Sequence, residues 1–222
     1  ERAYETLAAL HARRVAQGWR PVGRKIGFTN RTIWPRYNVY RPMWSHVWDR
    51  TVADAPDGVA TVDVSGLHEP RIEPEVVFGL SAPPPPQGGA REMLDVVAWI
   101  AAGFEIVHSV FPGWRFRAPD CTAQFGLHGK LVVGPRRTVG EDERDALFAL
   151  LPVFQVTLRK DGAVEDTGVG ANVLDSPAHA LAHLRDVLAS QPLSPPLRAG
   201  EIVTTGTITD AMPVAAGETW TS

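Results

Sequence analysis

The sequence predicts an α+β fold, in which many short strands are combined with about four helices. Two observations indicate this class. Short runs of Val, Ile and Phe, bounded by Gly, Pro and Asp, recur along the chain and are typical of strands. The helical patterns do not alternate regularly with these runs, which disfavours a doubly wound parallel sheet. With 222 residues, 44% of them hydrophobic, the chain is expected to form one domain over residues 1–222.

The first part of the chain is predicted to begin with a helix and to continue in strands. Apolar residues at helical spacing indicate a helix over residues 2–17, and a strand containing several glycines follows over residues 20–29. Residues 30–50 are rich in Trp and Tyr, and we expect an irregular segment that covers another part of the molecule. Weak alternation predicts strands within residues 51–64, and the Val and Phe run over residues 71–78 predicts another.

The rest of the chain is predicted to mix both kinds of element. A proline-rich surface loop at residues 81–89 precedes apolar residues at helical spacing, which predict a helix over residues 92–102. Further strands are expected at residues 104–107, 127–133, 153–159 with a return strand toward Gly168, and 197–209. Further helices are expected at residues 141–150 and 177–190, the second with Ser176 as its N-cap and Pro177 at its first position.

Three carboxylates lie within two apolar runs that are typical of buried or half-buried strands. Glu73 and Glu75 are two residues apart and therefore project from the same face of one strand, and Glu105 lies in the other run. Ionised acids this close repel each other and lose hydration on burial. A hard divalent cation such as Mg²⁺ or Mn²⁺, which prefers oxygen ligands, would offset both costs. The alternative is an edge strand with its acids in water, which Pro74 would suit.

Lys25 and the hydroxyl cluster around Gly206 each allow two interpretations. Lys25 is either an exposed strand lysine or an ammonium beside a metal-bound anion, where it would act as an electrostatic partner or proton carrier. Thr205 and Thr207 share a face if this segment is a strand, and their hydroxyls are then simply solvated. Around Gly206 the same groups could instead bind a carboxylate through hydroxyl and backbone N–H donors.

Several function classes find little support in the sequence. The net charge is −3 and no basic patch suggests nucleic acid binding. No apolar run approaches the length of a membrane span, and with Cys121 as the single cysteine the cytoplasm is the expected location. The Gly-Val-Gly of residues 168–170 resembles a dinucleotide fingerprint only loosely, and His179 with His183 lacks the Glu of a zinc-protease motif.

Five segments, in order along nearly the whole chain, resemble the 2-keto-4-pentenoate hydratase family of the fumarylacetoacetate hydrolase superfamily. The first reads Gly-Arg-Lys-Ile-Gly-Phe-Thr at residues 23–29, and the second is the Arg-Ile-Glu-Pro-Glu run that contains Glu73 and Glu75. The others are residues 105–109, 173–181 and 205–209. The resemblance implies a single catalytic domain built as a mixed, highly curved β roll with flanking helices. It also implies that a natural N-terminal segment is missing ahead of Tyr4.

The resemblance further implies a site and a reaction. Glu73, Glu75 and Glu105 would hold Mg²⁺ or Mn²⁺, and Lys25 would stabilise negative charge or carry a proton. The small-molecule 2-oxo acid substrate would be bound by Thr205, Gly206, Thr207, Asp120 and Gln124. The expected reaction is hydration of a 2-hydroxy-2,4-dienoate to a 4-hydroxy-2-oxo acid through a metal-stabilised enolate. Alternatives are decarboxylation of a 2-oxo-enedioate, hydrolysis of an acylpyruvate-type C–C bond, and non-catalytic binding of 2-oxo acids. A homo-oligomer is expected.

The chain departs from the family pattern at several positions. Met43 stands where the hydratases usually carry an Asp, and His46 either replaces that group or is a packing or surface histidine. Asp120 keeps its family place, but Gln124 and the residue after it replace an Asp-Asn pair. His108 also stands where the family often has an Asp. These departures predict an altered substrate pocket beside a retained metal site.

Overall fold

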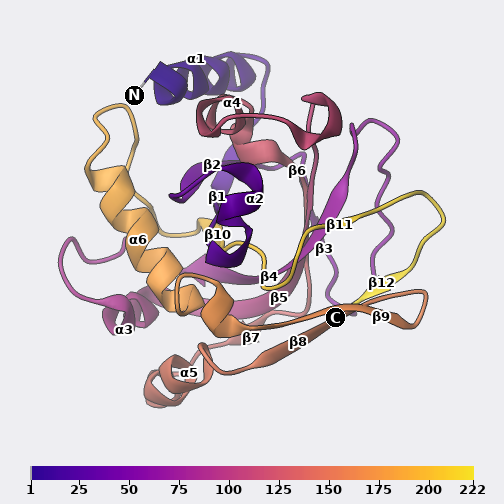
Figure 1. The fold of residues 1–222 in the computed structure, drawn as a ribbon. Helices are drawn as coiled ribbons and strands as arrows, with labels where there is room; N and C mark the ends of the chain where they lie inside the picture. Colours follow the sequence, from indigo (N-terminus) through magenta and orange to yellow (C-terminus); the bar gives the residue numbers. More distant parts are fainter. Residues whose placement is uncertain (1) are drawn as a thin grey trace.

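Most strands of the protein belong to one mixed sheet, as seen in a computed structural model that describes residues 2–222 (Figure 1). Its strands are β1 (Pro21–Gly27), β2 (Met43–Trp48), β3 (Val52–Asp54), β4 (Arg71–Leu80), β5 (Val97–Val107), β6 (His128–Val133), β7 (Arg137–Thr138), β10 (Ile202–Thr204) and β11 (Met212–Pro213). Its main path runs β2-β1-β10-β4-β5-β6-β3, while β11 pairs with β4 and β7 with β5. A smaller sheet joins β8 (Gln155–Lys160), β9 (Ala163–Val169) and β12 (Trp220–Thr221) in the order β12-β8-β9.

The helices surround this sheet. They are α1 (Arg2–Ala16), α2 (Trp34–Tyr37), α3 (Ala90–Met93), α4 (Ala118–Ala123), α5 (Arg144–Leu150) and α6 (Pro177–Ala189). Six 3₁₀ turns are also present within residues 2–222: η1 (Arg31–Ile33), η2 (Leu94–Val96), η3 (Pro112–Trp114), η4 (Phe125–Leu127), η5 (Glu141–Glu143) and η6 (Gly170–Asn172). Figure 1 shows α1 and α4 together at one end of the sheet and α6 along its side. The α+β class predicted from the sequence is confirmed.

The two faces of the sheet carry different side chains. Lys25 of β1 and the acids of β4 and β5 lie on one face, which we call the acidic face and which also carries the apolar cluster of Val47, Val77 and Leu131. The opposite face carries Arg24, Trp44, His46 and Trp48, and we call it the aromatic face. The larger core cluster lies on the aromatic face, where Trp48 and Phe78 pack with α6 residues such as Leu181.

The long antiparallel pair β4 and β5 organises the acidic face. It extends from Arg71 opposite Val107 to Leu80 opposite Val97, so each acid has a fixed cross-strand neighbour. The helix predicted over residues 92–102 is therefore wrong beyond η2, because β5 begins at Val97. The same apolar spacing fits both element types, and pairing with β4 satisfies the backbone groups of this segment in strand form. The strands expected at residues 71–78 and 104–107 are confirmed.

Other boundaries also differ from the sequence prediction. Residues 43–48, expected to be irregular, form the fully buried strand β2. Of residues 51–64 only β3 is a strand, and of residues 197–209 only β10 is. The chain turns at Gly206, whose φ of +98° is left-handed and where an added Cβ would come 1.9 Å from Thr29 Oγ1. Because of this turn, Thr205 and Thr207 do not share a strand face.

The remaining helix and strand predictions are confirmed within a few residues. The N-terminal helix is α1, and the strand around Lys25 is β1. Ser176 caps α6, accepting a hydrogen bond from the backbone N–H of Ala178, with Pro177 at the first helical position. No helix within residues 2–222 has both the length and the apolar character needed to cross a bilayer.

Candidate active site

Three carboxylates meet on the acidic face. Glu73 and Glu75 project from the same side of β4, and Glu105 of β5 stands directly opposite Glu73 in the antiparallel register. One carboxylate oxygen from each residue lies within 4.8 Å of the other two. The structure therefore brings together the three acids that the sequence singled out, at the spacing of a metal site.

Each acid is held differently. Glu105 is fully buried, and its Oε2 lies 2.8 Å from Lys25 Nζ while its Oε1 lies 2.6 Å from His128 Nδ1. Glu75 Oε2 accepts hydrogen bonds from the Thr204 hydroxyl and, at 2.8 Å, from the backbone N–H of Gly206. Within residues 2–222, the buried Glu75 Oε1 has no donor. A buried carboxylate oxygen without a donor is costly, which marks the place where a cation would fit.

The pKa values of the three acids diverge because their partners differ. Burial raises the pKa of Glu73 to about 7, although Lys25 opposes the rise. Burial, together with Glu105 and Glu73, raises the pKa of Glu75 well above its usual value. Burial acts on Glu105 in the same sense, but Lys25 and His128 outweigh it and lower the pKa of Glu105 to about 2. The cluster thus holds protons near neutral pH that a cation would displace.

Lys25 is the buried cation of this cluster. Its Nζ donates to Gly126 O at 2.9 Å and forms the ion pair with Glu105. Burial acts to lower the pKa of Lys25, but the neighbouring carboxylates raise it above the usual value. Of the two interpretations left open by the sequence, the exposed strand lysine is wrong, because Lys25 is only 3% exposed.

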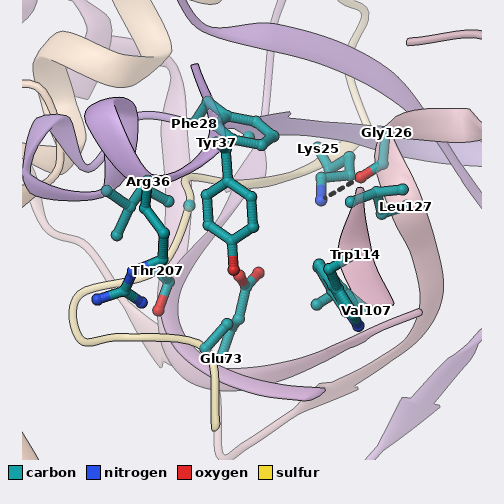
Figure 2. A pocket seen from close by; sticks show the side chains of 14 residues that line it. Lys25, Phe28, Arg36, Tyr37, Glu73, Val107, Trp114, Gly126, Leu127 and Thr207 are labelled. Carbon is teal, nitrogen blue, oxygen red and sulfur yellow. Dashed lines mark hydrogen bonds between the residues drawn. The ribbon is translucent and has the colours of Figure 1, made fainter. Parts of the chain in front are cut away.

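A cavity opens beside Lys25 and Glu73 (Figure 2). It contains about 520 Å³ of space including its open mouth, and apolar and aromatic side chains dominate its wall: Phe28, Ile33, Tyr37, Val107, Trp114 and Leu127. Figure 2 shows the Tyr37 hydroxyl directed toward the Glu73 carboxylate, and that hydroxyl accepts a hydrogen bond from Arg71 at 3.0 Å. Arg36 also lines the cavity, and its guanidinium pairs with Asp210 at 2.9 Å.

The substrate-binding residues implied by the resemblance are not all at this cavity. Gly206 and Thr207 line it, although the Thr207 hydroxyl donates to Thr209 O at 2.8 Å. Thr205 is fully buried behind them, where its hydroxyl donates to Val76 O at 3.0 Å. Asp120 and Gln124 line a different depression together with His128. Asp120 accepts a hydrogen bond from the Arg117 backbone N–H, which caps the start of α4.

The residues considered as replacements for the family's Asp also lie elsewhere. Met43 is buried in β2 and is not among the residues that line the cavity. His46 stands opposite Arg24 in the β1–β2 register and therefore faces the aromatic side of the sheet, away from Lys25. His46 is thus wrong as a substitute for the missing acid. Strand alternation would have revealed this if β2 had been recognised as a strand.

The aromatic wall and the His128 contact were missed as site features. Tyr37 belongs to the Trp- and Tyr-rich segment expected to cover another part of the molecule, so composition gave a partial signal. Trp114 lies in the short η3 turn and His128 begins β6 after the irregular η4 turn. Neither position has a periodic pattern from which its direction could be predicted.

Comparison with known proteins identifies the family. No protein-family model matches the chain. The 2-hydroxyhexa-2,4-dienoate hydratase of Comamonas testosteroni is 30% identical over 220 residues, covering 98% of this chain and 80% of that protein. The 2-keto-4-pentenoate hydratase of Paraburkholderia xenovorans is 30% identical over 97% of this chain and 77% of its own length. The chain belongs to the 2-keto-4-pentenoate hydratase family.

Solved structures agree with this assignment. The 4-oxalocrotonate decarboxylase of Pseudomonas putida G7, complexed with magnesium and adipate, matches with a TM-score of 0.86 at 26% identity, over 98% of this chain and 79% of that one. Fumarylpyruvate hydrolase of Pseudomonas aeruginosa, in complex with Mn²⁺ and pyruvate, matches with a TM-score of 0.65 at 14% identity, over 89% and 82% of the two chains. The predicted fold of the fumarylacetoacetate hydrolase superfamily is confirmed.

The residues of this family member fit a divalent cation. Three hard oxygen donors converge, and the donorless Glu75 Oε1 and the raised pKa values of Glu73 and Glu75 both indicate uncompensated negative charge. Solved relatives carry magnesium, calcium or manganese, which supports a divalent metal in this family. That Glu73, Glu75 and Glu105 are its ligands stays a prediction.

Proposed function

We propose that the protein is a divalent-metal-dependent hydratase that adds water to a 2-hydroxy-2,4-dienoate and releases a 4-hydroxy-2-oxo acid. The observation that carries the proposal is the convergence of Glu73, Glu75 and Glu105 beside a buried lysine at the edge of an apolar cavity. Mg²⁺ or Mn²⁺ held there would polarise the carboxylate and carbonyl oxygens of a 2-oxo acid. Family membership supports the same chemistry, since the relatives include two named dienoate or pentenoate hydratases.

The chain's own residues can supply charge stabilisation and proton transfer. Lys25 lines the cavity with a buried ammonium and so can stabilise the negative charge that develops on the substrate oxygen. Tyr37 accepts from Arg71 and keeps its own O–H proton available as a donor near Glu73. During hydration a proton arrives at C5 as the dienol becomes a ketone. Water then adds at C4 and a second proton arrives at C3, so groups able to hold protons on both sides of the substrate are required.

The cavity wall favours hydration over decarboxylation. A 2-oxo-enedioate carries a second carboxylate on its tail, which would need a cation or several donors once desolvated. Both cations that line the cavity within residues 2–222 are already paired, Lys25 with Glu105 and Arg36 with Asp210. The aromatic and aliphatic wall instead suits the uncharged tail of a dienoate. Sequence identity alone does not separate the two activities, because the 4-oxalocrotonate decarboxylase of Pseudomonas sp. strain CF600 is 29% identical.

Turnover assays with matched substrates test the proposal. The purified protein, supplied with Mg²⁺ or Mn²⁺, is given 2-hydroxypenta-2,4-dienoate in one series and 2-oxohex-3-enedioate in another. Loss of diene absorbance without CO₂ release is expected in the first series, and little CO₂ release in the second. Faster CO₂ release from the enedioate would reverse the assignment to decarboxylase. Binding of oxalate or pyruvate without turnover of either substrate would identify a non-catalytic binder.

A further inference from the structure

The imidazole of His128 lies on the acidic face but belongs to none of the five segments that resemble the family. We propose that His128, held in turn by Thr51, is a positioning residue that fixes the Glu105 carboxylate as a one-oxygen metal ligand. The inference rests on the metal site proposed above. Its support comes from the register of β5 and β6, from the two hydrogen bonds of the imidazole, and from the different partners of the two Glu105 oxygens.

A register shift turns His128 toward Glu105. In the β5–β6 pair, Ile106 stands opposite Lys130 but Val107 stands opposite His128, so Gly129 is an extra residue in β6. Cross-strand partners project from the same face, and this shift therefore places His128 on the acidic face, diagonal to Glu105. Without the extra residue, Gly129 would face Val107 and His128 would point to the other side.

Gly129 makes this shift possible. A Cβ added there would come 2.7 Å from the backbone oxygen of Ile106, much closer than a carbon and an oxygen can approach. The position therefore requires glycine for the two strands to remain paired. In the His-Gly sequence at residues 128–129, the histidine thus supplies the imidazole and the glycine allows the bulge that turns it toward Glu105.

Both imidazole nitrogens are engaged. Nδ1 of His128 lies 2.6 Å from Glu105 Oε1, and because a carboxylate oxygen accepts hydrogen bonds, the imidazole is the donor in this contact. Nε2 of His128 lies 2.8 Å from the Thr51 hydroxyl, which also contacts the backbone O and N of Trp48 at 2.9 and 3.2 Å. The ring is therefore tied to the turn that ends β2, and it is only 4% exposed.

The two oxygens of Glu105 consequently have separate partners. Oε1 is occupied by the imidazole, and Oε2 is the oxygen that pairs with Lys25. Rotation of the carboxylate would break the bond from His128 within a fully buried site, where a lost donor is costly. His128 thereby prevents Glu105 from using both oxygens on one cation, and leaves Glu73 and Glu75 to complete the ligand set. Hydrogen bonds to the ligands of a metal commonly set its affinity in this way.

Calorimetric titration of the metal-free protein with MnCl₂ alone tests the inference. His128→Leu, which removes both ring nitrogens at similar volume, is expected to weaken Mn²⁺ binding about 10-fold to 100-fold. His128→Asn keeps an N–H close to the position of Nδ1 and is expected to regain most of the lost affinity. In steady-state assays His128→Leu should raise the Mn²⁺ concentration needed for half-maximal rate, and saturating Mn²⁺ should recover part of kcat.

Two further variants keep the result interpretable. Thr51→Val removes the Nε2 contact and the contacts of the hydroxyl with Trp48, but it leaves the hydrogen bond between His128 and Glu105 in place. A smaller loss of Mn²⁺ affinity, about threefold to tenfold, is therefore expected even if His128→Leu fails to fold. His179→Leu is the matched control, because His179 of α6 packs against Phe148 rather than the acids, and its Mn²⁺ affinity should equal that of the wild type. Wild-type affinity in both Thr51→Val and a folded His128→Leu would overturn the positioning role alone. Absence of Mn²⁺ binding to the wild type would overturn the metal site itself.

Discussion

Lys25 and Arg24 are neighbours on β1 and are almost equally buried, at 3% and 2% exposure, yet they serve opposite faces of the sheet. On the acidic face Lys25 meets three carboxylates and a cavity. On the aromatic face Arg24 meets Glu201 at 3.0 Å and lies 5.6 Å above the ring of Trp44. Adjacent residues of one strand thus bury the same charge in different surroundings, a group of three acids on one face and a single acid among aromatic rings on the other.

The two faces solve the cost of buried charge in different ways. On the aromatic face, burial followed by Arg24 lowers the pKa of His46 to about 2, so the imidazole is neutral and stacks on His11 at 3.9 Å. On the acidic face, negative charge exceeds positive charge and Glu73 borders open space. An uncompensated group of acids beside a cavity can bind a cation and a substrate, whereas a neutral, filled layer can only stabilise the fold.

The largest expected effect is on Mn²⁺ binding, and it should distinguish substitutions of acids on the acidic face from those on the aromatic face. Glu73→Ala or Glu105→Ala should weaken Mn²⁺ binding at least about 100-fold and abolish hydration, because each removes one of three oxygen donors. Glu201→Gln, which changes an acid on the aromatic side, should leave Mn²⁺ affinity unchanged. Calorimetry with MnCl₂ measures the affinities. Normal Mn²⁺ binding by either alanine variant would show that the metal lies elsewhere.

The neighbouring cations of β1 provide the next comparison. Lys25→Met should lower kcat about 100-fold or more, because the substrate loses a buried donor and proton carrier. Arg24→Met should leave kcat nearly unchanged but reduce the free energy of unfolding by up to about 3 kcal/mol, since Glu201 loses its partner. Diene absorbance and urea titration measure the two effects. Equal losses of kcat in both variants would contradict separate roles for the two faces.

A smaller effect is expected in the pH dependence of stability on the acidic face. The folded-state pKa of Glu73 is about 7, above the usual 4.5, so the folded protein binds more protons than the unfolded chain between these values. The free energy of unfolding of the metal-free protein should therefore fall as pH rises from about 4.5 to 7. Urea titrations in chelator measure this slope, and added Mn²⁺ should reduce it. If the free energy of unfolding instead rises with pH over this range, the pKa of Glu73 in the folded protein lies below its usual value.

The aromatic face should show the opposite pH slope, with the smallest effect of the four. His46 has a folded-state pKa of about 2 against the usual 6.5, so the unfolded chain binds more protons and stability should fall as pH decreases below about 6.5. His46→Phe removes the titrating group, so the free energy of unfolding should depend less on pH below about 6.5. The Mn²⁺ affinity should be unchanged. Comparison of urea midpoints at pH 5 and 7 in both proteins measures the change. If the variant loses as much stability between pH 7 and 5 as the wild type, groups other than His46 cause the pH dependence.

Sequence reasoning recovered the site where strand alternation and acid spacing coincide. Glu73 and Glu75 lie two residues apart in an apolar run, and that pattern predicts their shared face without knowledge of the fold. It could not place Asp120, which keeps its family position, or Gln124, which replaces a family Asp, and both line a separate depression. Their direction depends on the short helix α4 and on residues such as Phe125, whose φ is +52°, and no periodic pattern describes such a segment.

The sequence by itself determined the α+β class, the pair of strands that carry the acids, and the presence of Lys25 beside glycines. The tertiary structure alone decided that Glu73 faces Glu105, that Lys25 and Arg24 serve opposite faces, and that His128 holds a carboxylate oxygen. The physical reason is that strand propensity and alternation are local properties, whereas register is set by long-range pairing. A shift of one residue at Gly129 turns a side chain to the other face, and only the paired strands reveal that shift.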